Sequence, residues 1–285
     1  MRGLLLFVIA LGLGWAGASF YAYDRDAAPA AAAQESTYAR VMRTQELRCG
    51  YMLYEPMVRR DPNSGAFSGV AVDVAEELGR LLNIRIVWAE ETGFGTAIEG
   101  LRTRRYDALC IGYWRLAAEG KHLYYTIPYA YSIDQIVVRA DDARFDADYR
   151  TINTPGVRII SADGMEATRI ARRDFPKAAL TELPNMARDA DLAEHVAAGK
   201  ADVTFLDAAM AESYRAANPG RLKLVPLAQP IRIFQNTFAL PQDERLKAML
   251  DTAMNELIEN GGMDIILDKY DPQRKLLRRV RRGME

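Results

Sequence analysis

Short apolar runs typical of strands alternate with amphipathic helix patterns along most of the chain, and this alternation limits the fold more than any other feature. In the first half, Val74, Leu78, Leu81 and Leu82 recur at helical spacing, and the β-branched run 84–88 follows them. Strands that alternate with helices over short links form parallel sheets. The sequence therefore predicts an α/β protein with a doubly wound, mostly parallel sheet.

The same alternation starts again after Val137, which divides the chain into two α/β units. The second unit is expected to contain strands 157–160, 180–183 and 203–206 and helices 165–175, 186–198 and 208–216, and the amphipathic helix 246–258 follows it. In open α/β sheets, ligands bind beyond the carboxyl ends of the strands. Two units therefore suggest two lobes with a ligand cleft between them.

The N-terminal segment indicates export from the cytoplasm. An apolar run from Leu4 to Leu13 is followed by small residues at Ala16 and Ala18, the pattern of a signal peptide (1–18) that is cleaved after Ala18. The uncharged stretch 4–23 is also long enough to remain as a membrane anchor, although cleavage is the favoured interpretation. Both interpretations carry the rest of the chain across a membrane.

Charge is close to balanced over the whole chain but uneven along it. The 37 Lys and Arg against 38 Asp and Glu give a net charge of −1, which argues against a nucleic-acid partner. Residues 19–40, rich in alanine, are interpreted as a flexible tether. Residues 274–285 form a tail with six basic side chains, interpreted as a solvated end, with contact to a membrane surface or a partner as the alternative.

Two cysteines in an exported chain raise the question of a disulfide. Cys49 and Cys110 each lie in a strand-like run, and a bridge can form if these strands are neighbours; two separate buried thiols are the favoured interpretation. Two Cys and two His are too few for a metal site, so no metal and no cofactor are expected. The motifs of phosphate loops, zinc proteases and serine hydrolases do not occur, and no catalytic residue is assigned.

Aromatic and acidic residues follow the predicted strands, where a ligand would bind. Such a set describes a site for a small polar, amine-bearing molecule. Core packing is the alternative for each aromatic, and Asp207 is also a candidate helix N-cap, a role compatible with ligand contact. The candidate binding residues are Tyr54, Phe94, Gly112, Trp114, Arg115, Asp163, Gly164 and Asp207.

Several short motifs occur in a characteristic order between about 45 and 272. They are the run 65–74, Tyr106-Asp107-Ala108, Tyr125-Thr126-Ile127-Pro128-Tyr129, Gly199-Lys200-Ala201-Asp202 before Asp207, and Gly261-Gly262 to Lys269-Tyr270. With these motifs the chain resembles the bacterial extracellular solute-binding proteins of family 3, the type 2 periplasmic binding proteins of ABC importers.

The resemblance implies two α/β lobes joined by two strand crossovers, which close on a ligand by a hinge. Lobe 1 would take 41–134 plus 236–273, and lobe 2 would take 135–235. The resemblance also implies a role for each candidate residue. Tyr54 and Phe94 would sandwich the ligand, Gly112 and Trp114 would contact it, Asp163-Gly164 would form an anion-contact turn, and Asp207 would hold an ammonium group.

The chain departs from the family at the residues that bind a carboxylate. The amino-acid binders of the family carry Thr-x-x-Arg after the third strand, and the arginine clamps the α-carboxylate. The matching positions here are Leu116 and Glu119, and only the neighbouring Arg115 could substitute. The retained Asp207 therefore favours a cationic or zwitterionic ligand of another shape.

The leading hypothesis is a monomeric, non-enzymatic periplasmic protein that delivers a small solute to an ABC permease, with membrane contact only through an uncleaved N-terminal segment. One alternative is a membrane-anchored sensor or accessory binding domain. Another is an enzyme, because some relatives of this fold are cyclohexadienyl dehydratases. Its candidate acid–base groups are Glu55, Glu119 and Asp163.

Overall fold

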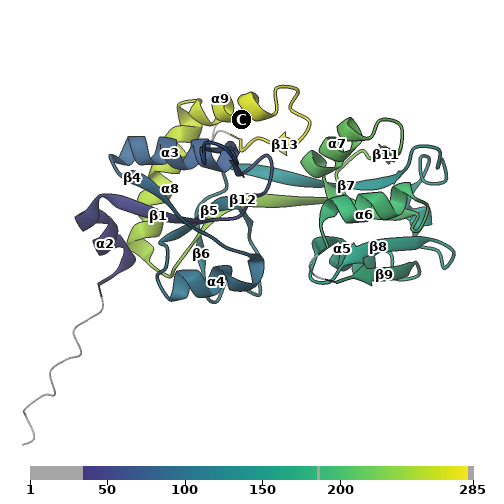
Figure 1. Cartoon of the computed structure of the whole chain (residues 1–285), viewed down its shortest axis with the longest axis horizontal. Coiled ribbons are helices and arrows are strands. Elements are labelled where there is room, and N and C mark those ends of the chain that lie inside the picture. The colour runs from purple at the N-terminus through teal and green to yellow at the C-terminus, as the bar shows by residue number, and fades with distance from the viewer. Residues whose placement is uncertain (1–34, 185–186, 282–285) are drawn as a thin grey trace, which may run out of the picture. The chain divides into compact units, whose positions relative to one another are not determined.

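A computed structural model describes residues 35–184 and 187–281 (Figure 1). The predicted signal peptide 1–18, the alternative anchor 4–23 and the tether as far as residue 34 lie outside the described residues. In the described part of the chain, no helix combines the length and the apolar character that crossing a membrane requires.

One mixed sheet forms the centre of the structure. Its main strands are β1 (Glu46–Tyr51), β4 (Arg85–Glu91), β5 (Ala108–Trp114), β7 (Ala130–Arg139), β8 (Arg158–Ala162), β9 (Ala179–Leu183), β10 (Val203–Asp207) and β12 (Arg232–Leu240). Their order is β4-β1-β5-β12-β7-β10-β8-β9. The groups β4-β1-β5 and β10-β8-β9 are parallel, and they flank the antiparallel pair of β12 and β7. The predicted α/β class is confirmed, and the antiparallel centre is an addition to it.

Helices connect the parallel strands within each lobe. They are α3 (Val70–Leu82), α4 (Phe94–Arg102), α5 (Glu166–Asp174) and α6 (Asp189–Ala197), and α7 (Ala208–Ala217) follows β10. The other helices are α2 (Thr37–Thr44) before β1, the 3-10 helix η1 (Tyr149–Ile152), and α8 (Glu244–Glu259) and α9 (Gly262–Tyr270) after β12. The shorter strands are β2 (Arg59–Arg60), β3 (Phe67–Ser68), β6 (Tyr124–Tyr125), β11 (Leu222–Leu224) and β13 (Leu277–Arg278).

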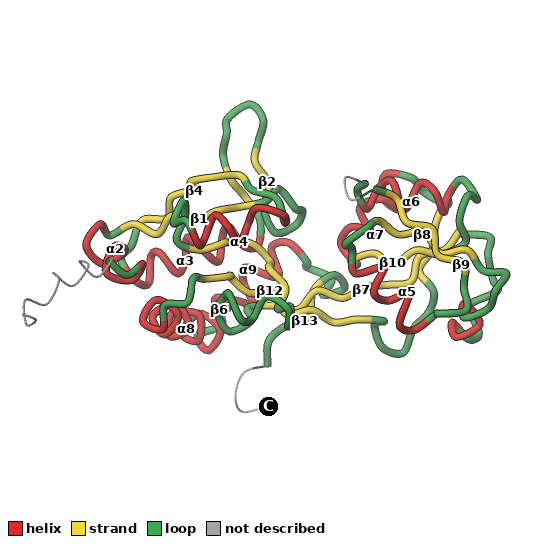
Figure 2. Tube along the Cα trace, turned by 90° about the horizontal axis from the view of Figure 1, so that it is seen from below, coloured by secondary structure: helices red, strands yellow, loops and turns green. Residues whose placement is uncertain are grey.

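The hydrophobic core divides into two regions at the crossover strands. One region takes buried residues from 41–130 and 238–277, and the other lies within 136–225. Strand β7 enters the first core at Ala130 and the second at Ile136. Figure 2 shows β7 and β12 side by side as they pass from one lobe to the other, in agreement with their antiparallel pairing. The two lobes are therefore joined by paired strands.

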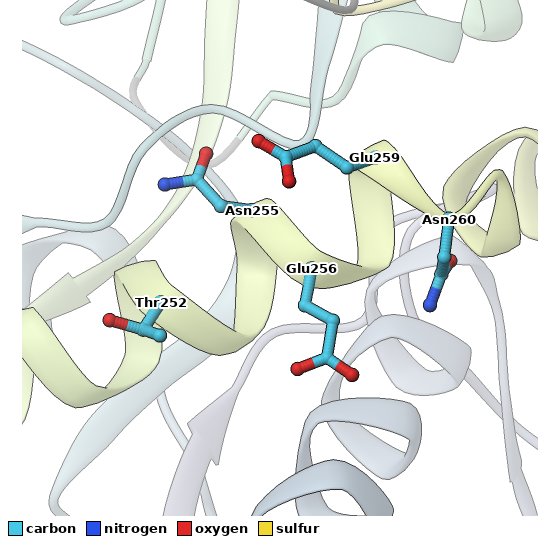
Figure 3. Close-up of a pocket in the computed structure, with 5 residues that line it drawn as sticks. All are labelled: Thr252, Asn255, Glu256, Glu259 and Asn260. Carbon is cyan, nitrogen blue, oxygen red and sulfur yellow. The ribbon is translucent and has the colours of Figure 1, made fainter.

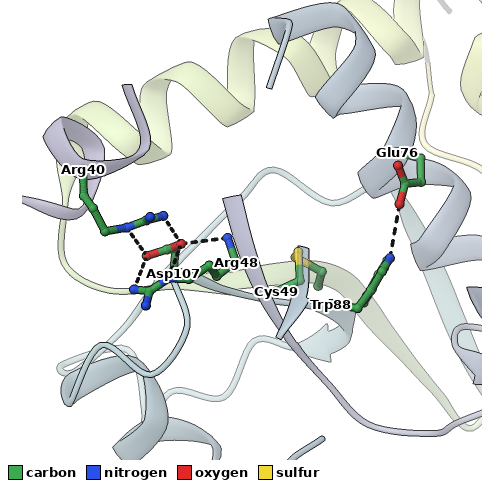
Figure 4. Close-up of a disulfide and its surroundings, with 7 residues drawn as sticks. Arg40, Arg48, Cys49, Glu76, Trp88 and Asp107 are labelled. Atoms are coloured by element: carbon green, nitrogen blue, oxygen red, sulfur yellow. Dashed lines mark hydrogen bonds and ion pairs between the residues drawn. A yellow bond between two sulfur atoms is a disulfide. The ribbon is translucent and has the colours of Figure 1, made fainter. Parts of the chain in front are cut away.

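A buried aspartate, Asp107, joins the amino ends of β1 and β5 in lobe 1. Asp107 directly precedes β5 and is 1% exposed, and its Oδ2 accepts a hydrogen bond of 2.7 Å from the Arg48 N–H. The Arg48 guanidinium and that of Arg40 on α2 also bind this carboxylate (Figure 4). This contact joins α2 to the sheet of lobe 1, and the Tyr38 N–H at the start of α2 donates a hydrogen bond of 2.8 Å to Asp243 Oδ2. Helix α2 therefore begins inside the stretch 19–40 that was interpreted as a tether.

Lobe 2 repeats this arrangement with different residues. Asp202 precedes β10, and its Oδ2 accepts a hydrogen bond of 2.9 Å from the Arg158 N–H. Guanidinium groups of Arg158 and Arg144 bind the same carboxylate. Burial alone would raise the pKa of Asp202, but the hydrogen bonds from these arginines hold it well below its usual range. Buried carboxylates at the amino ends of the strands are thus paired with cations in both lobes.

The two cysteines form a disulfide between neighbouring strands. Cys49 of β1 and Cys110 of β5 lie with their Cα atoms 5.4 Å apart, and both are fully buried (Figure 4). The interpretation as two separate thiols was wrong, because it required a relative placement of the two strands that sequence patterns do not contain. The bridge closes a sequence separation of 61 residues.

The basic tail is partly built into lobe 1. Asp271 accepts hydrogen bonds of 2.9–3.0 Å from three successive N–H groups, those of residues 275, 276 and 277. Strand β13 then pairs with β7, with Leu277 opposite Ser132. Arg279 is ion-paired with Asp268 at 2.6 Å. The described part of the tail is therefore packed against the crossover strand, in contrast to the solvated end expected from its composition.

Candidate functional site

Asp207 stands at the carboxyl end of β10 and caps α7. Its Oδ1 accepts a hydrogen bond of 2.8 Å from the Ala209 N–H, as expected of an N-cap. The residue is only 7% exposed, and its Oδ2 is buried with no hydrogen-bond partner in the described structure. An unpaired buried carboxylate oxygen is costly in a folded protein. One oxygen of Asp207 thus caps the helix, and the other is buried without a hydrogen-bond partner in the described structure.

A second buried carboxylate lies directly opposite Asp207. The register of the antiparallel pair β7 and β10 places Asp134 across from Asp207, and Asp134 is 3% exposed. Like charges in directly opposite positions destabilise a strand pair. Burial, and then the charge of Asp207, raise the pKa of Asp134 well above its usual range. Burial likewise raises the pKa of Asp207 to about 6.

A third carboxylate completes the carboxylate cluster, by which we mean Asp134, Asp189 and Asp207. Asp189 is the first residue of α6, and burial raises its pKa. Its charge acts on both Asp134 and Asp207. The three side chains come from a crossover strand, a helix start and a strand end of lobe 2. The cluster therefore lies at the carboxyl edge of the sheet, where a ligand was expected.

Tyr54 is a residue of lobe 1 that lies close to the carboxylate cluster. The residue follows β1, and its backbone is held by a pair of hydrogen bonds with Val58 of 2.8–2.9 Å. Burial, followed by the charges of Asp207, Asp189 and Asp134, raises the pKa of the Tyr54 hydroxyl well above 10. Tyr54 and Asp207, both predicted to bind ligand, are thus brought together by the structure, one from each lobe.

Gly112 and Trp114 are two residues apart in β5 and therefore lie on one face of that strand. The Trp114 ring stacks on Phe234 of β12 with a centroid distance of 4.0 Å and an interplanar angle of 9°. Its Nε1 is buried and has no hydrogen-bond partner among the described residues. A Cβ at Gly112 would lie 2.9 Å from Asn236 Oδ1, so this glycine is needed for close packing against β12. Trp114 is therefore the better candidate for ligand contact.

Two guanidinium groups on these elements already have partners. Arg115, which could substitute for the family's carboxylate clamp, donates a hydrogen bond of 2.5 Å from Nη2 to the Thr126 carbonyl. Arg232 lies opposite Asp134 in the pairing of β12 with β7, but its side chain is ion-paired with Asp174. The carboxylate cluster therefore lies beside arginines that are directed to other groups.

The remaining candidates occupy more open positions. Asp163 is exposed and follows β8, and Gly164 has a left-handed φ of +81° with open space where a side chain would stand. Both lie at the same carboxyl edge as Asp207, because β8 and β10 are parallel. Phe94 is the first residue of α4, and its side chain lies outside the described part of the structure. No described contact joins these three residues to the carboxylate cluster.

Asp134 and Asp189 were not among the residues predicted from the sequence. An acidic residue between Ile133 and Ile136 in an apolar strand is the one local signal that singles out Asp134. The approach of Asp134 to Asp207 depends on the register of β7 with β10, which a sequence pattern does not reveal. For Asp189, the position at a helix start is shared by many solvated carboxylates.

A surface depression of about 450 Å³ lies elsewhere, along α8. It is lined by Thr252, Asn255, Glu256, Glu259 and Asn260, which all belong to one helix and its C-terminal end. Figure 3 shows Asn255 and Glu259 on one side of the helix and Glu256 and Asn260 on the other. These side chains do not converge on a common point, and none of the predicted binding residues is among them.

Comparison with solved structures supports the two-lobed architecture. The ancestral amino acid-binding protein AncCDT-1, described as a precursor of cyclohexadienyl dehydratase, matches with a TM-score of 0.69 at 23% identity over 82% of this chain and 99% of its own. A binding component of an ABC transporter from Wolinella succinogenes complexed with lysine matches with a TM-score of 0.68 at 21% identity, over 79% and 95%. A mutant of ArgBP from T. maritima matches with a TM-score of 0.65 at 22% identity, over 83% of this chain and 100% of its own.

Sequence comparison with characterised proteins finds a cyclohexadienyl dehydratase of Pseudomonas aeruginosa, 26% identical over 233 residues, which cover 81% of this chain and 84% of that protein. The family model of the bacterial extracellular solute-binding proteins, family 3, matches residues 47–273. That match spans the described structure from β1 to the end of α9. The chain therefore belongs to the bacterial extracellular solute-binding proteins of family 3.

Proposed function

We propose that this protein binds a small amine-bearing solute between its two lobes and delivers it to an ABC importer. The main support for this proposal is the buried Oδ2 of Asp207, which has no hydrogen-bond partner in the described structure. Asp207 also lies opposite a second buried carboxylate, Asp134. A protonated amine supplies both the charge and the hydrogen bonds that this oxygen lacks.

Binding would join the two lobes through the solute. In this proposal Asp207 accepts hydrogen bonds from the ammonium group while the Ala209 N–H keeps the carboxylate oriented. Tyr54 contributes from lobe 1, and Trp114 offers its buried indole N–H and its ring. Gly112, Phe94, Arg115 and Asp163-Gly164 complete the proposed binding surface. Closure then occurs about β7 and β12, the strands that connect the lobes.

The cellular setting of the proposal follows from the family and the N-terminal sequence. Solute-binding proteins of this family act outside the cytoplasm. We propose a monomeric periplasmic protein, cleaved after Ala18, with an ABC permease as its partner. Mass spectrometry of the exported protein tests this directly, because an N-terminus at residue 19 supports a free binding protein. An intact residue 1 in the membrane fraction would instead support an anchored sensor or accessory domain.

A thermal-shift screen of the exported protein against amino acids, polyamines, betaines, keto acids and sugars tests the function. A ligand at a hundredfold excess over Kd stabilises the folded state by about 2.7 kcal/mol. We expect stabilisation by amines, and we expect Asp207→Asn to abolish it. Asparagine remains an N-cap, so α7 is preserved. Asp148→Asn is a matched control, because Asp148 caps η1 through its Oδ1 outside the site. A flat response to every class would contradict the proposal.

A second candidate function is a dehydratase, favoured by the 26% identity with cyclohexadienyl dehydratase and by the pKa of Asp207, raised to about 6, a value suited to acid–base catalysis. The charge of the site argues against it, because prephenate and arogenate carry carboxylates that the cluster would repel. Of the acids considered from the sequence, Glu55 and Asp163 are exposed, and Glu119 accepts a hydrogen bond from Tyr125. Turnover of prephenate or arogenate by the purified protein would establish this function instead.

A further inference from the structure

The carboxyl edge of lobe 2 is acidic at each helix that begins there. Backbone N–H groups at a helix start form a ready binding site for an anion such as a solute carboxylate. Here α7 begins at Asp207, which caps it, α6 begins with Asp189, and α5 begins with Glu166. Each of the three helix starts already carries a carboxylate of the protein. A carboxylate on the solute would therefore meet negative charge at every one of them.

Arg188, which directly precedes Asp189, is exposed and ion-paired with Asp191 at 3.6 Å. Neither Arg232 nor Arg115 offers a replacement for the family's carboxylate clamp. Arg232 faces Asp134 across the strand pair, but its Nη1 donates to the Ile231 carbonyl at 2.6 Å and its Nη2 pairs with Asp174. On lobe 1, Arg115 donates to the Thr126 carbonyl. Recognition of a solute carboxylate by a guanidinium uses two parallel hydrogen bonds, and both of these groups already donate to other partners.

The burial and the placement of the carboxylates in the cluster also favour a cationic ligand. Asp134 and Asp207 are directly opposite each other in neighbouring strands, and both are more than nine-tenths buried. The Oδ2 of Asp207 has no hydrogen-bond partner in the described structure. One ammonium group between them would satisfy that oxygen and relieve the repulsion of the pair. Asp189 then remains as a counter-charge for a second cationic group on the same molecule.

From these observations we propose that the solute is a carboxylate-free cation with two basic groups, a diamine or a guanidino-amine, in preference to an amino acid. The proposal rests on the proposed function and narrows its substrate class. It requires Asp134 and Asp207 to bind one cationic group and Asp189 to face the other. The absence of an α-carboxylate removes the group that the carboxyl edge of lobe 2 disfavours.

Isothermal titration of the exported protein with pairs of compounds that differ only by the carboxylate tests the proposal. The pairs are lysine and cadaverine, ornithine and putrescine, and arginine and agmatine. We expect the decarboxylated compound to bind at least tenfold more tightly in the pair that binds best. Equal or tighter binding of the amino acid would overturn this inference and leave the proposed function intact. Failure of all six compounds to bind would also overturn this inference, and the proposed function falls only if the thermal-shift screen is flat for every class of compound.

Two variants assign the preference to the cluster. Asp134→Asn and Asp189→Asn each remove one carboxyl group of the cluster, and we expect each to weaken the best diamine at least tenfold. Asp148→Asn removes one charge outside the cluster and should leave the affinity within twofold of the original. Circular dichroism establishes that each variant is folded. If Asp134→Asn and Asp189→Asn, once folded, bind the diamine as tightly as the unaltered protein, the proposed contacts are wrong.

Discussion

Two sets of buried aspartates occupy opposite edges of the same sheet and differ in their partners. At the amino ends of the strands, Asp107 and Asp202 are each bound by two arginines and a backbone N–H. At the carboxyl ends, Asp134 and Asp207 face each other with no such pairing among the described contacts. The same residue type therefore stabilises the fold at one edge and holds unsatisfied charge at the other, where the solute is proposed to bind.

The largest expected effect is the loss of a paired carboxylate. Asp107→Ala leaves two arginines without their acceptor, and we expect it to lower the free energy of unfolding by about 3–5 kcal/mol. Urea denaturation measures this. Arg102→Ala breaks the exposed ion pair with Glu99 and serves as a control, with an expected loss of below about 0.5 kcal/mol. Similar losses in both variants would contradict the stabilising role of the buried pairing of Asp107 with arginines.

The disulfide between β1 and β5 is expected to stabilise lobe 1. Replacing Cys49 and Cys110 together by alanine opens a loop of 61 residues, and we expect a loss of about 2–4 kcal/mol in the free energy of unfolding. Dithiothreitol should lower the stability of the unaltered protein by a similar amount and leave the double variant unchanged. If the reductant has no effect on the unaltered protein, the disulfide does not contribute as proposed.

Substitution of Asp207, at the carboxyl ends of the strands, is expected to increase the free energy of unfolding, whereas substitution of Asp107 is expected to lower it. Because burial raises the pKa of Asp207 to about 6, the ionised carboxylate destabilises the folded state above that pH, and the destabilisation declines as pH falls toward the unfolded-state value near 4. Asp207→Asn should therefore increase the free energy of unfolding at pH 8, by about 2–3 kcal/mol, and this gain should shrink by about 1 kcal/mol at pH 5. Urea denaturation at the two pH values measures the difference, and a variant that is less stable at pH 8 contradicts it.

The smallest expected effect concerns the tail. Arg279→Ala removes the ion pairs with Asp268 and Asp271 that hold β13 against β7, and we expect a loss of about 1 kcal/mol. Hydrogen exchange at residues 276–278 should increase more than exchange in β10. Unchanged protection of the tail would show that β13 is held by other contacts.

The sequence predicts most of the fold and part of the candidate site. Alternating strand and helix patterns predict the α/β class and elements such as α3 and α8, because each buries one face at a regular spacing. The packing of α2 against lobe 1 and the pairing of β13 with β7 could not be predicted, because they involve tertiary contacts of Arg40 and Asp271.

The same limit applies within the site. Asp207 and Tyr54 were identified from strand ends and a family resemblance, and their roles as ligand contacts stay predictions. Asp134 and Asp189 were missed, since only the register of β7 with β10 and the placement of α6 bring them to Asp207. Local patterns thus predict the edge of the sheet at which a ligand is proposed to bind, whereas the charge of the candidate site depends on contacts between distant segments.

In the proposed function, the buried carboxylate of Asp207 lowers the stability of the ligand-free protein and binds an amine. Urea denaturation of the unaltered protein and Asp207→Asn at pH 8, each with and without the best-binding diamine, tests it most directly. We predict that the variant is the more stable protein without ligand and gains nothing when the diamine is added, while the unaltered protein is stabilised. A variant that is less stable without ligand and is still stabilised by the diamine would contradict the claim.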